Sequence, residues 1–479
     1  MSTPPATRDT LHKSDARGSE RLTLRASTAR ITALAWPVLV GQLAVVSFAT
    51  IDTALVARHS AADLAALAIG GAAYISAFIG LAGIVLAIGP LAGQLFGAKR
   101  FAAAGEQLHQ AVWLALGVSL LGCALLLFPA PFLALARASP EVEAKVRAYL
   151  VALALSLPAS MLFSAFRGFN NAVSRPKAVM AIQLGGLALK LPLSALLVFG
   201  AGPLPALGVT GCGISTCIVM WCQALVAWQL LRRDPFYKPF ALTGRGLHAP
   251  DRRALWTQLK LGVPIGGSIL VEVTGFAFMA FFIARVSVEA VAGHQIAANL
   301  VSLLFMLPLS IGNATSALVA QRIGAQELHA ARRIGWHGMQ LAALCALGLG
   351  AAVFVAREAI VRLYSGNEVI VAAALPLLAW VALFHFVDAM QIAAAFVLRA
   401  WRIATVPLLI YAASIWGLGM GGGYVLAFNV GGNVPTALHG ARGYWIASTV
   451  GLAAAALGLT LFLLWVLRQQ RTQGLGPRR

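Results

Sequence analysis

Acidic residues are scarce in this sequence of 479 residues, which has 16 Asp and Glu against 36 Lys and Arg. Charged residues make up only 11% of the chain, whereas about 25% is usual in soluble globular domains. With 59% hydrophobic residues, a soluble chain would have too little polar surface to cover itself. The composition excludes a disordered protein, a coiled coil and most cytosolic enzymes, and it predicts a polytopic membrane protein.

Cysteine is also rare, and the sequence signatures of catalysis are missing. The five cysteines form no Cys-x-x-Cys pair and lie in apolar stretches, so they indicate neither a disulfide framework nor a zinc site. We find no Ser/His/Asp set and no Walker motif. The glycine-rich run at 417–423 lacks the strand and the Lys-Ser/Thr of a phosphate-binding loop, so it predicts a hinge or close helix packing. The sequence predicts neither an enzyme nor a cofactor.

Long apolar runs fill the chain after residue 30. Each is near or above the roughly 20 residues with which an α-helix crosses a bilayer, and none alternates as the strands of a membrane barrel do. The first 30 residues are polar and lack a signal-peptide pattern, so we expect a disordered cytoplasmic tail. We predict an all-α polytopic protein with twelve transmembrane helices, at residues 31–57, 64–89, 107–129, 146–169, 177–200, 206–231, 255–284, 291–316, 337–356, 369–398, 404–427 and 441–467.

The excess of positive charge follows the predicted topology. If the N-terminus is cytoplasmic, three quarters of the 36 Lys and Arg residues fall on the cytoplasmic side, and only Lys190 lies inside a span. This bias is the positive-inside rule, and a miscounted span would scramble it. We therefore interpret the net charge of +20 as a topology signal that faces anionic lipid, not as a nucleic-acid-binding surface. Both termini are then cytoplasmic.

The two halves of the chain resemble each other. Segments 94–98 and 321–325 read Gln-Leu-Phe-Gly-Ala and Gln-Arg-Ile-Gly-Ala, at the same offset as Pro37 and Pro264. Because an even number of spans returns the chain to its starting side, the two repeats are parallel. We predict an N-lobe and a C-lobe of six helices each, and a monomer, because one chain supplies both lobes. The predicted parts are a tail at 1–30, the N-lobe at 31–231, a basic cytoplasmic linker at 232–254, the C-lobe at 255–467 and a cytoplasmic tail at 468–479.

Four ionisable residues lie well inside the predicted spans: Asp52, Lys190, Glu272 and Asp388. A charge at the bilayer centre costs at least ~2.5 kcal/mol, so such residues persist only when they are paired, neutralised or exposed to a polar cavity. They either line ion and substrate sites or lock helices together, and the second reading fits Asp52 with Lys190 best. Counting about 1.5 Å per residue places Glu272 and Asp388 near the membrane midplane, both in the C-lobe.

Glu272 and Asp388 are therefore expected to share a site. Two carboxylates in one low-dielectric pocket cannot both ionise cheaply, so they share a proton or bind a cation. Either state makes a coupling site, and either would alternate with an organic cation.

Other candidates lie on the same or neighbouring spans. Phe384 is one helical turn before Asp388 and offers a ring to a cation, with plain packing as the alternative. His385 is on a similar face and either tunes that proton or is a satisfied core histidine. Gln295 and Asn299 open the eighth span, where they line a cavity or bond between helices.

Several longer segments, spread over both halves, form a recognisable set. Together they resemble the multidrug and toxic compound extrusion (MATE) family, in its bacterial NorM-like branch, over about residues 30–468. The segments are Pro37-Val-Leu-Val with Ile51-Asp52-Thr53, Gln94-Leu-Phe-Gly-Ala98, Pro264 with Glu272-Val, Val291-Ala-Gly-His-Gln-Ile296, Phe305-Met-Leu-Pro-Leu-Ser-Ile-Gly312, and Asp388-Ala-Met-Gln391 with Leu398-Arg399.

This resemblance implies a secondary transporter of the inner (plasma) membrane. Such a protein exports organic, mostly cationic compounds by alternating access, in antiport with Na⁺ or H⁺ and without a cofactor. The resemblance also implies a cation site at Glu272 and Asp388 and a second acidic site at Asp52. Gln391 lies in a matching segment and is a further candidate for the substrate cavity.

Two positions depart from the family pattern. Two asparagines of the fifth span are replaced by Lys190 and Ser194, and the tyrosine one turn before Asp388 is replaced by Phe384. The first change puts the cation site of the N-lobe in question. We hypothesise that Lys190 neutralises Asp52 as a tethered cation and leaves ion coupling to the acids of the C-lobe.

A lipid-linked saccharide or lipid flippase of the same superfamily is the first alternative. Such proteins tend to need cationic cavity residues for phosphate groups, and several carry extra helices, whereas this chain has three intramembrane acids and one lysine in twelve spans. A membrane-embedded enzyme would need a catalytic set that we do not find. A channel or a purely structural protein fits the internal repeat and the midplane acids less well.

Overall fold

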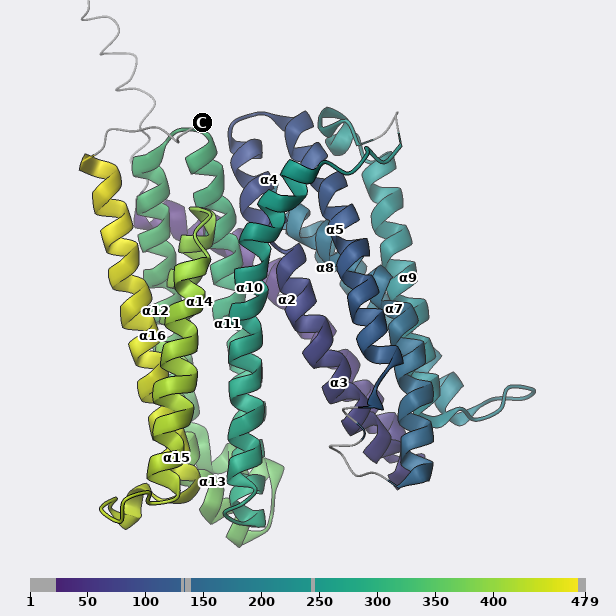
Figure 1. The fold of residues 1–479 in the computed structure, drawn as a ribbon, viewed down its shortest axis with the longest axis vertical. Helices are drawn as coiled ribbons and strands as arrows, with labels where there is room; N and C mark the ends of the chain where they lie inside the picture. The colour runs from purple at the N-terminus through teal and green to yellow at the C-terminus, as the bar shows by residue number, and fades with distance from the viewer. Residues whose placement is uncertain (1–22, 131–132, 134–138, 243–245, 473–479) are drawn as a thin grey trace, which may run out of the picture.

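The computed structural model describes residues 23–130, 133, 139–242 and 246–472. Over these residues the chain is helical apart from short connections and one isolated β-bridge between Ala201 and Leu204. Twelve helical segments of the described chain are long and apolar enough to cross a membrane. This confirms the predicted all-α class and the number of spans. Figure 1 shows the helices in two bundles that lie side by side.

The N-lobe contains the first six spans. Its second span is divided at residues 86–87 into α3 and α4, and a short 3₁₀ helix, η1 (Pro235–Phe240), follows the last span. The bounds are α2 (Leu24–Ala57), α3 (Ala61–Val85) with α4 (Ile88–Gly97), α5 (Phe101–Leu127), α7 (Pro140–Ala172), α8 (Pro176–Phe199) and α9 (Gly208–Arg233).

The C-lobe contains the other six spans, and its fifth is irregular. A π-helix, η2 (Ala412–Gly421), lies between α14 (Thr405–Tyr411) and α15 (Gly422–Ala427). The other bounds are α10 (Arg252–Ile283), α11 (Val288–Gly324), α12 (Leu328–Tyr364), α13 (Glu368–Ala400) and α16 (Gly440–Thr472), with a 3₁₀ turn η3 (Thr436–Leu438) before α16.

The glycine-rich run at 417–423 lies in the π-helix and in the start of α15. A Cβ atom added at Gly423 would lie 2.4 Å from the Tyr444 ring of α16, and one at Gly451 would lie 2.6 Å from the Ser414 carbonyl oxygen. The glycines therefore allow the close packing between η2, α15 and α16 that the sequence indicates.

Several helices extend beyond the predicted lobe boundaries. The first begins at Leu24, with the Thr23 hydroxyl accepting from the Ala26 N–H, so residues 24–30 of the predicted tail are helical. The last continues to Thr472, into the predicted C-terminal tail. A helix satisfies its own backbone hydrogen bonds, so it continues past the hydrocarbon core without cost. Residues 1–22 and 473–479 of the two tails lie outside the described residues.

The linker between the lobes packs on the N-lobe through η1. Tyr237 is buried, and its hydroxyl donates to Asn170 Oδ1 on α7 over 2.5 Å. Burial raises the pKa of Tyr237 to about 12. Phe240 packs edge-on against Phe169, with ring centroids 5.3 Å apart. The linker lies at the upper end of the molecule in Figure 1, the end that the distribution of Lys and Arg predicts to be cytoplasmic.

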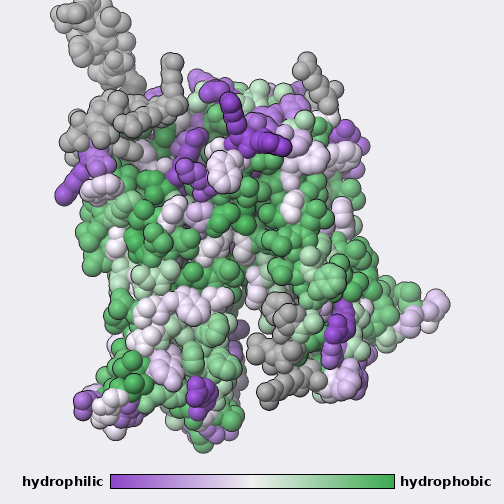
Figure 2. All heavy atoms as spheres, viewed as in Figure 1, coloured by the Kyte–Doolittle hydropathy of each residue, from purple (hydrophilic) through white to green (hydrophobic). Residues whose placement is uncertain are grey.

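The two lobes touch in the half of the molecule nearer the predicted cytoplasmic end. The contacts join α4 to α11, α3 to α10 and α2 to α11. In Figure 2 a hydrophobic band separates polar ends, and the lobes meet in the upper half of the view and stand apart in the lower half. The inter-lobe contact is therefore one-sided.

The duplicated segments 94–98 and 321–325 form the centre of this contact. The Gln94 side chain donates to the Ala400 carbonyl oxygen over 2.8 Å, and the Gln321 side chain donates to the Ala172 carbonyl oxygen over 2.7 Å. The backbones of the two segments also cross at close range. A Cβ atom at Gly97 would lie 1.8 Å from the Gln321 carbonyl oxygen, and one at Gly324 would lie 1.8 Å from that of Gln94. Small residues are what lets helices approach closely in a membrane.

We predict that Gly97→Ala and Gly324→Ala each destabilise the protein. The new methyl group overlaps a backbone oxygen of the other lobe, and overpacking of this kind typically costs about 1–3 kcal/mol. The midpoint of thermal unfolding in detergent measures the effect. Gly117→Ala on α5 is the control, because a Cβ there meets nothing within 4 Å. Equal midpoints for Gly97→Ala and Gly117→Ala would contradict the assignment of this crossing as a tight contact.

Candidate functional site

Asp52 and Lys190 lie on the buried faces of α2 and α8. Asp52 continues a stripe of buried residues at spacings of four, Ala44, Phe48 and Val56, along α2. Lys190 belongs to an equivalent stripe on α8 that also contains Gly186, Ser194 and Val198. Residues four apart lie on one helix face, so each helix carries its charge into the N-lobe instead of toward lipid.

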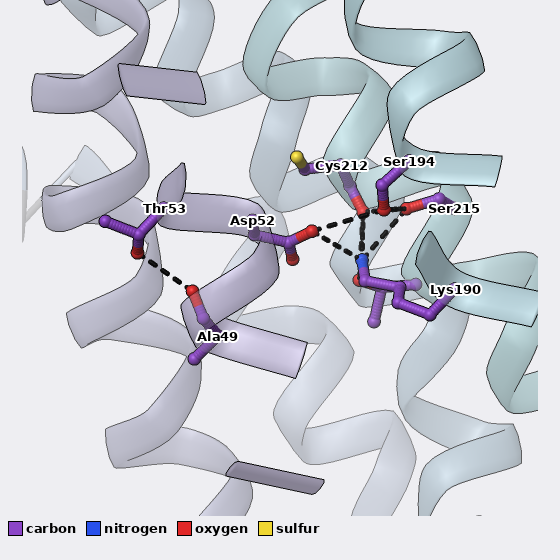
Figure 3. Close-up of polar contacts among 8 residues, drawn as sticks. Ala49, Asp52, Thr53, Lys190, Ser194, Cys212 and Ser215 are labelled. Atoms are coloured by element: carbon purple, nitrogen blue, oxygen red, sulfur yellow. Dashed lines mark hydrogen bonds and ion pairs between the residues drawn. The ribbon is translucent and has the colours of Figure 1, made fainter. Parts of the chain in front are cut away.

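The structure brings these two charges together. Lys190 Nζ lies 2.9 Å from Asp52 Oδ1; the lysine side chain is fully buried and that of Asp52 is 8% exposed. Ser194 Oγ, one turn beyond Lys190, donates to the same carboxylate oxygen over 3.3 Å. Figure 3 shows Asp52 directed away from the Thr53 side of its helix and toward α8 and α9.

The ammonium group of Lys190 is fully satisfied by its surroundings. Besides Asp52 it contacts the Cys212 carbonyl oxygen at 3.1 Å, Ser215 Oγ at 2.9 Å and Thr216 Oγ1 at 2.7 Å, all on α9. An ammonium has three protons to donate, and at least that many acceptors surround it. The pair thus ties α2, α8 and α9 together, and the ammonium occupies the position of a cation beside Asp52.

Glu272 and Asp388 meet at a second place, in the C-lobe. Glu272 lies on α10 and Asp388 on α13, and both line one small cavity of about 30 Å³. A water molecule needs about 10–15 Å³ of such volume, so the cavity has room for a water or a small monovalent cation. The structure therefore places the two acids in one site, as the sequence predicts.

Asp388 can accept further hydrogen bonds. Its Oδ1 atom receives a hydrogen bond from Gln391 Nε2 over 3.1 Å, and its Oδ2 atom has no partner among the described residues. Glu272 forms no hydrogen bond or ion pair with the described part of the chain, but it interacts electrostatically with Asp388 and Arg399. Unpaired buried acceptors are costly, so a proton or cation bound in this cavity would remove that cost.

Aromatic side chains and the π-helix close the cavity. The Phe384 ring packs edge-on against Phe276, with centroids 5.6 Å apart, and against Trp445, with centroids 5.5 Å apart. Ile415 and Gly419 of η2 form part of the opposite lining. π-Helical segments often lie at functional sites, and here η2 contributes Gly419 to the lining of the cavity.

Gln391 contacts Asp388 but lines neither this cavity nor the larger one between the lobes, and three other predicted candidates lie elsewhere. His385 is buried, and neither of its ring nitrogens has a partner among the described residues, but it does not line the cavity. Gln295 and Asn299 are exposed on one face of α11, and Asn299 accepts from the Tyr364 hydroxyl over 2.8 Å. Neither lines the small cavity or the larger one between the lobes, because the opposite face of α11 is the one that packs inward.

The larger cavity, of about 330 Å³, lies between the lobes and has residues of both in its wall. Glu272 lines it as well as the small cavity. Arg167 of α7 and Arg399 of α13 also line it, although the predicted topology counts both among the Lys and Arg residues of the cytoplasmic side. Their similar positions near the ends of the fourth and tenth spans were the only signal that could have placed them here.

Two bundles of six helices around buried carboxylates define a multi-pass membrane transporter. The chain belongs to the MatE family, because the sequence model of that family matches residues 37–196 and again residues 264–425. The two matches begin at Pro37 and Pro264, the residues that mark the internal repeat. This agrees with the family resemblance seen in the sequence.

Named relatives support the same assignment. The chain is 41% identical over 436 residues to "Probable multidrug resistance protein NorM" of Aromatoleum aromaticum, covering 91% of this chain and 92% of the relative. It is 33% identical over 446 residues to "Multidrug resistance protein PmpM" of Pseudomonas aeruginosa, covering 93% of both chains. The fold is also similar to that of the Vibrio cholerae MATE transporter VcmN in the bent form, with a TM-score of 0.82, 18% identity and coverage of 94% and 99%.

We predict that Lys190→Ala destabilises the protein, because it leaves the Asp52 carboxylate buried without its cation. Breaking a buried pair in this way typically costs about 3–5 kcal/mol. The double variant Asp52→Ala/Lys190→Ala should recover part of the loss. The midpoint of thermal unfolding in detergent measures both effects.

Lys177→Ala is the matched control for this pair, because Lys177 is an exposed lysine at the start of the same helix. It should leave the midpoint nearly unchanged. A double variant no more stable than the worse single variant would show that the two charges do not compensate each other.

Proposed function

We propose that this chain is a secondary active multidrug efflux transporter. It exports organic, mostly cationic compounds by alternating access, in antiport with Na⁺ or H⁺. The proposal includes a position in the bacterial inner (plasma) membrane, cytoplasmic termini and a monomeric state. Membership of the MatE family, the names of the relatives and the distribution of Lys and Arg support it.

The observation that carries the proposal is the position of Glu272. This carboxylate lies in the wall of both the small cavity with Asp388 and the large cavity between the lobes. An antiporter requires that the coupling ion and the substrate affect each other's binding. A carboxylate shared by both cavities does this directly, because its charge attracts a cationic substrate only while no proton or Na⁺ neutralises it.

The exchange cycle follows from this competition. In one state the lobes are separated on the side opposite the predicted cytoplasmic end. A Na⁺ ion or a proton then enters the acidic cavity and neutralises the carboxylates. The substrate cation loses its electrostatic partner and leaves. After the lobes reverse, loss of the ion restores the negative charge of Glu272 and a new cation binds. Each ligand thus shifts the equilibrium by its differential affinity for the two states.

The N-lobe does not take part in ion coupling in this proposal. The Lys190 ammonium already holds the position beside Asp52, with Ser215 and Thr216 completing its coordination. A mobile cation would have to displace a covalently attached one. Coupling therefore rests on Glu272 and Asp388.

The relatives favour efflux over the flippase alternative, since the proteins reported above carry names for multidrug resistance. Small cavities lined by two carboxylates also suit a monovalent cation better than a lipid phosphate.

We predict that Glu272→Gln and Asp388→Asn each abolish gradient-driven export while the protein still inserts and folds. Both changes keep the size of the side chain and remove the charge that the ion neutralises. Export of a cationic dye such as ethidium from proteoliposomes measures the activity. Imposing a Na⁺ gradient and a H⁺ gradient in separate experiments identifies the coupling ion.

Glu289→Gln is the control for this experiment, because Glu289 is exposed at the start of α11. It should export like the unmodified protein. Full export by either Glu272→Gln or Asp388→Asn would rule out the coupling role of that carboxylate.

A further inference from the structure

The cavity between the lobes carries more positive than negative charge. Among the described residues that line it, the only charged ones are Arg167, Arg399 and Glu272. Most of the remaining wall is apolar, with side chains such as Phe305 and Ile392. A purely cationic ligand would therefore meet two guanidinium groups and a single carboxylate.

Neither guanidinium is neutralised in the way that other buried cations of this protein are. Arg167 donates one hydrogen bond, to Gln42 Oε1 over 3.2 Å, and forms no ion pair with a carboxylate of the described chain. Arg399 stacks on the Phe396 ring at 4.6 Å and is attracted electrostatically to Glu272 without an ion pair. By contrast, Lys190 is fully coordinated.

An arginine has five N–H donors, so both side chains keep most of their donors available to a ligand. Holding a cation in a low-dielectric region without an anionic partner is unfavourable. A ligand that brings an anionic group into the cavity would remove this cost. The planar guanidinium suits a carboxylate in particular, because it can form two parallel hydrogen bonds with one.

The two arginines also come from different lobes. Arg167 lies near the end of α7, the fourth span of the first repeat, and Arg399 near the end of α13, the fourth span of the second; the two helices end at Ala172 and Ala400. A ligand held by both would contact both halves of the transporter. The lobes move relative to each other during transport, so such a ligand would be sensitive to their separation.

We propose that Arg167 and Arg399 form an anion-recognition subsite of the substrate cavity, and that it binds the carboxylate of zwitterionic amphiphiles. The positively charged group of the same molecule faces Glu272, and its aromatic or aliphatic body contacts the apolar wall. This inference rests on the proposed efflux function and narrows its substrate class.

The test compares a zwitterionic fluoroquinolone with its methyl ester, which lacks the negative charge but keeps the amine and the ring system. Binding to purified protein is measured by calorimetry, and export is measured in proteoliposomes. For Arg167→Gln and Arg399→Gln we expect about tenfold weaker fluoroquinolone binding, the size of a lost charge-assisted hydrogen bond. Binding of the ester and of ethidium should change by less than about twofold. Arg399→Lys keeps the positive charge but loses the paired N–H donors of the guanidinium. Its fluoroquinolone affinity should therefore lie between that of the unmodified protein and that of Arg399→Gln.

Arg333→Gln is the matched control, because Arg333 is exposed at the predicted cytoplasmic end of α12 and does not line this cavity. Equal losses for the fluoroquinolone and its ester, or no loss for either, would overturn the subsite. If the arginine variants discriminate the two ligands in binding but the unmodified protein exports neither under any gradient, the subsite stands and the efflux function fails. Thermal midpoints identify variants that do not fold.

Discussion

The cost of holding charge inside a membrane governs the architecture of this protein. Each ionisable residue in the spans must be paired, neutralised or turned toward a cavity. Asp52 and Lys190 are paired with each other, with the lysine side chain fully buried and its Nζ atom 2.9 Å from Asp52 Oδ1. Glu272 and Asp388 are instead turned toward a cavity, which is too small for an organic molecule but large enough for an ion. The two lobes share a fold but have opposite electrostatic designs.

In the proposed mechanism this difference gives the two lobes different roles. The N-lobe carries its own cation, Lys190, whose contacts join three helices, and in the proposed mechanism this lobe therefore cycles no ion. In the C-lobe, one carboxylate oxygen of Asp388 has no partner among the described residues and lies beside a π-helical turn and a glycine-rich segment. The close glycine crossings at residues 97 and 324 and the hydrogen bonds from the Gln94 and Gln321 side chains hold the lobes together at one end.

Much of the fold could be predicted from the sequence, because hydrophobicity alone requires it. Runs of about 20 apolar residues can only be membrane helices, and the alternation of basic loops orders them. The ends of the helices were harder to predict, because nothing in hydropathy marks where a helix leaves the bilayer. For example, α2 begins at Leu24, within the expected tail. The rarity of intramembrane charge identified Asp52, Lys190, Glu272 and Asp388. It could not identify Arg167 and Arg399, which lie near helix ends and count as ordinary topology charges.

The sequence by itself determined the twelve helices, the two repeats and the four ionisable residues buried in the spans. Composition and periodicity are local properties, and the bilayer translates them into structure without reference to other helices. Only the tertiary structure decided that Lys190 reaches Asp52, that Glu272 borders two cavities, and that Gln295 and Asn299 face away from both. These outcomes depend on the rotation of each helix about its axis. Side-chain packing between helices sets that rotation, and no single segment encodes it.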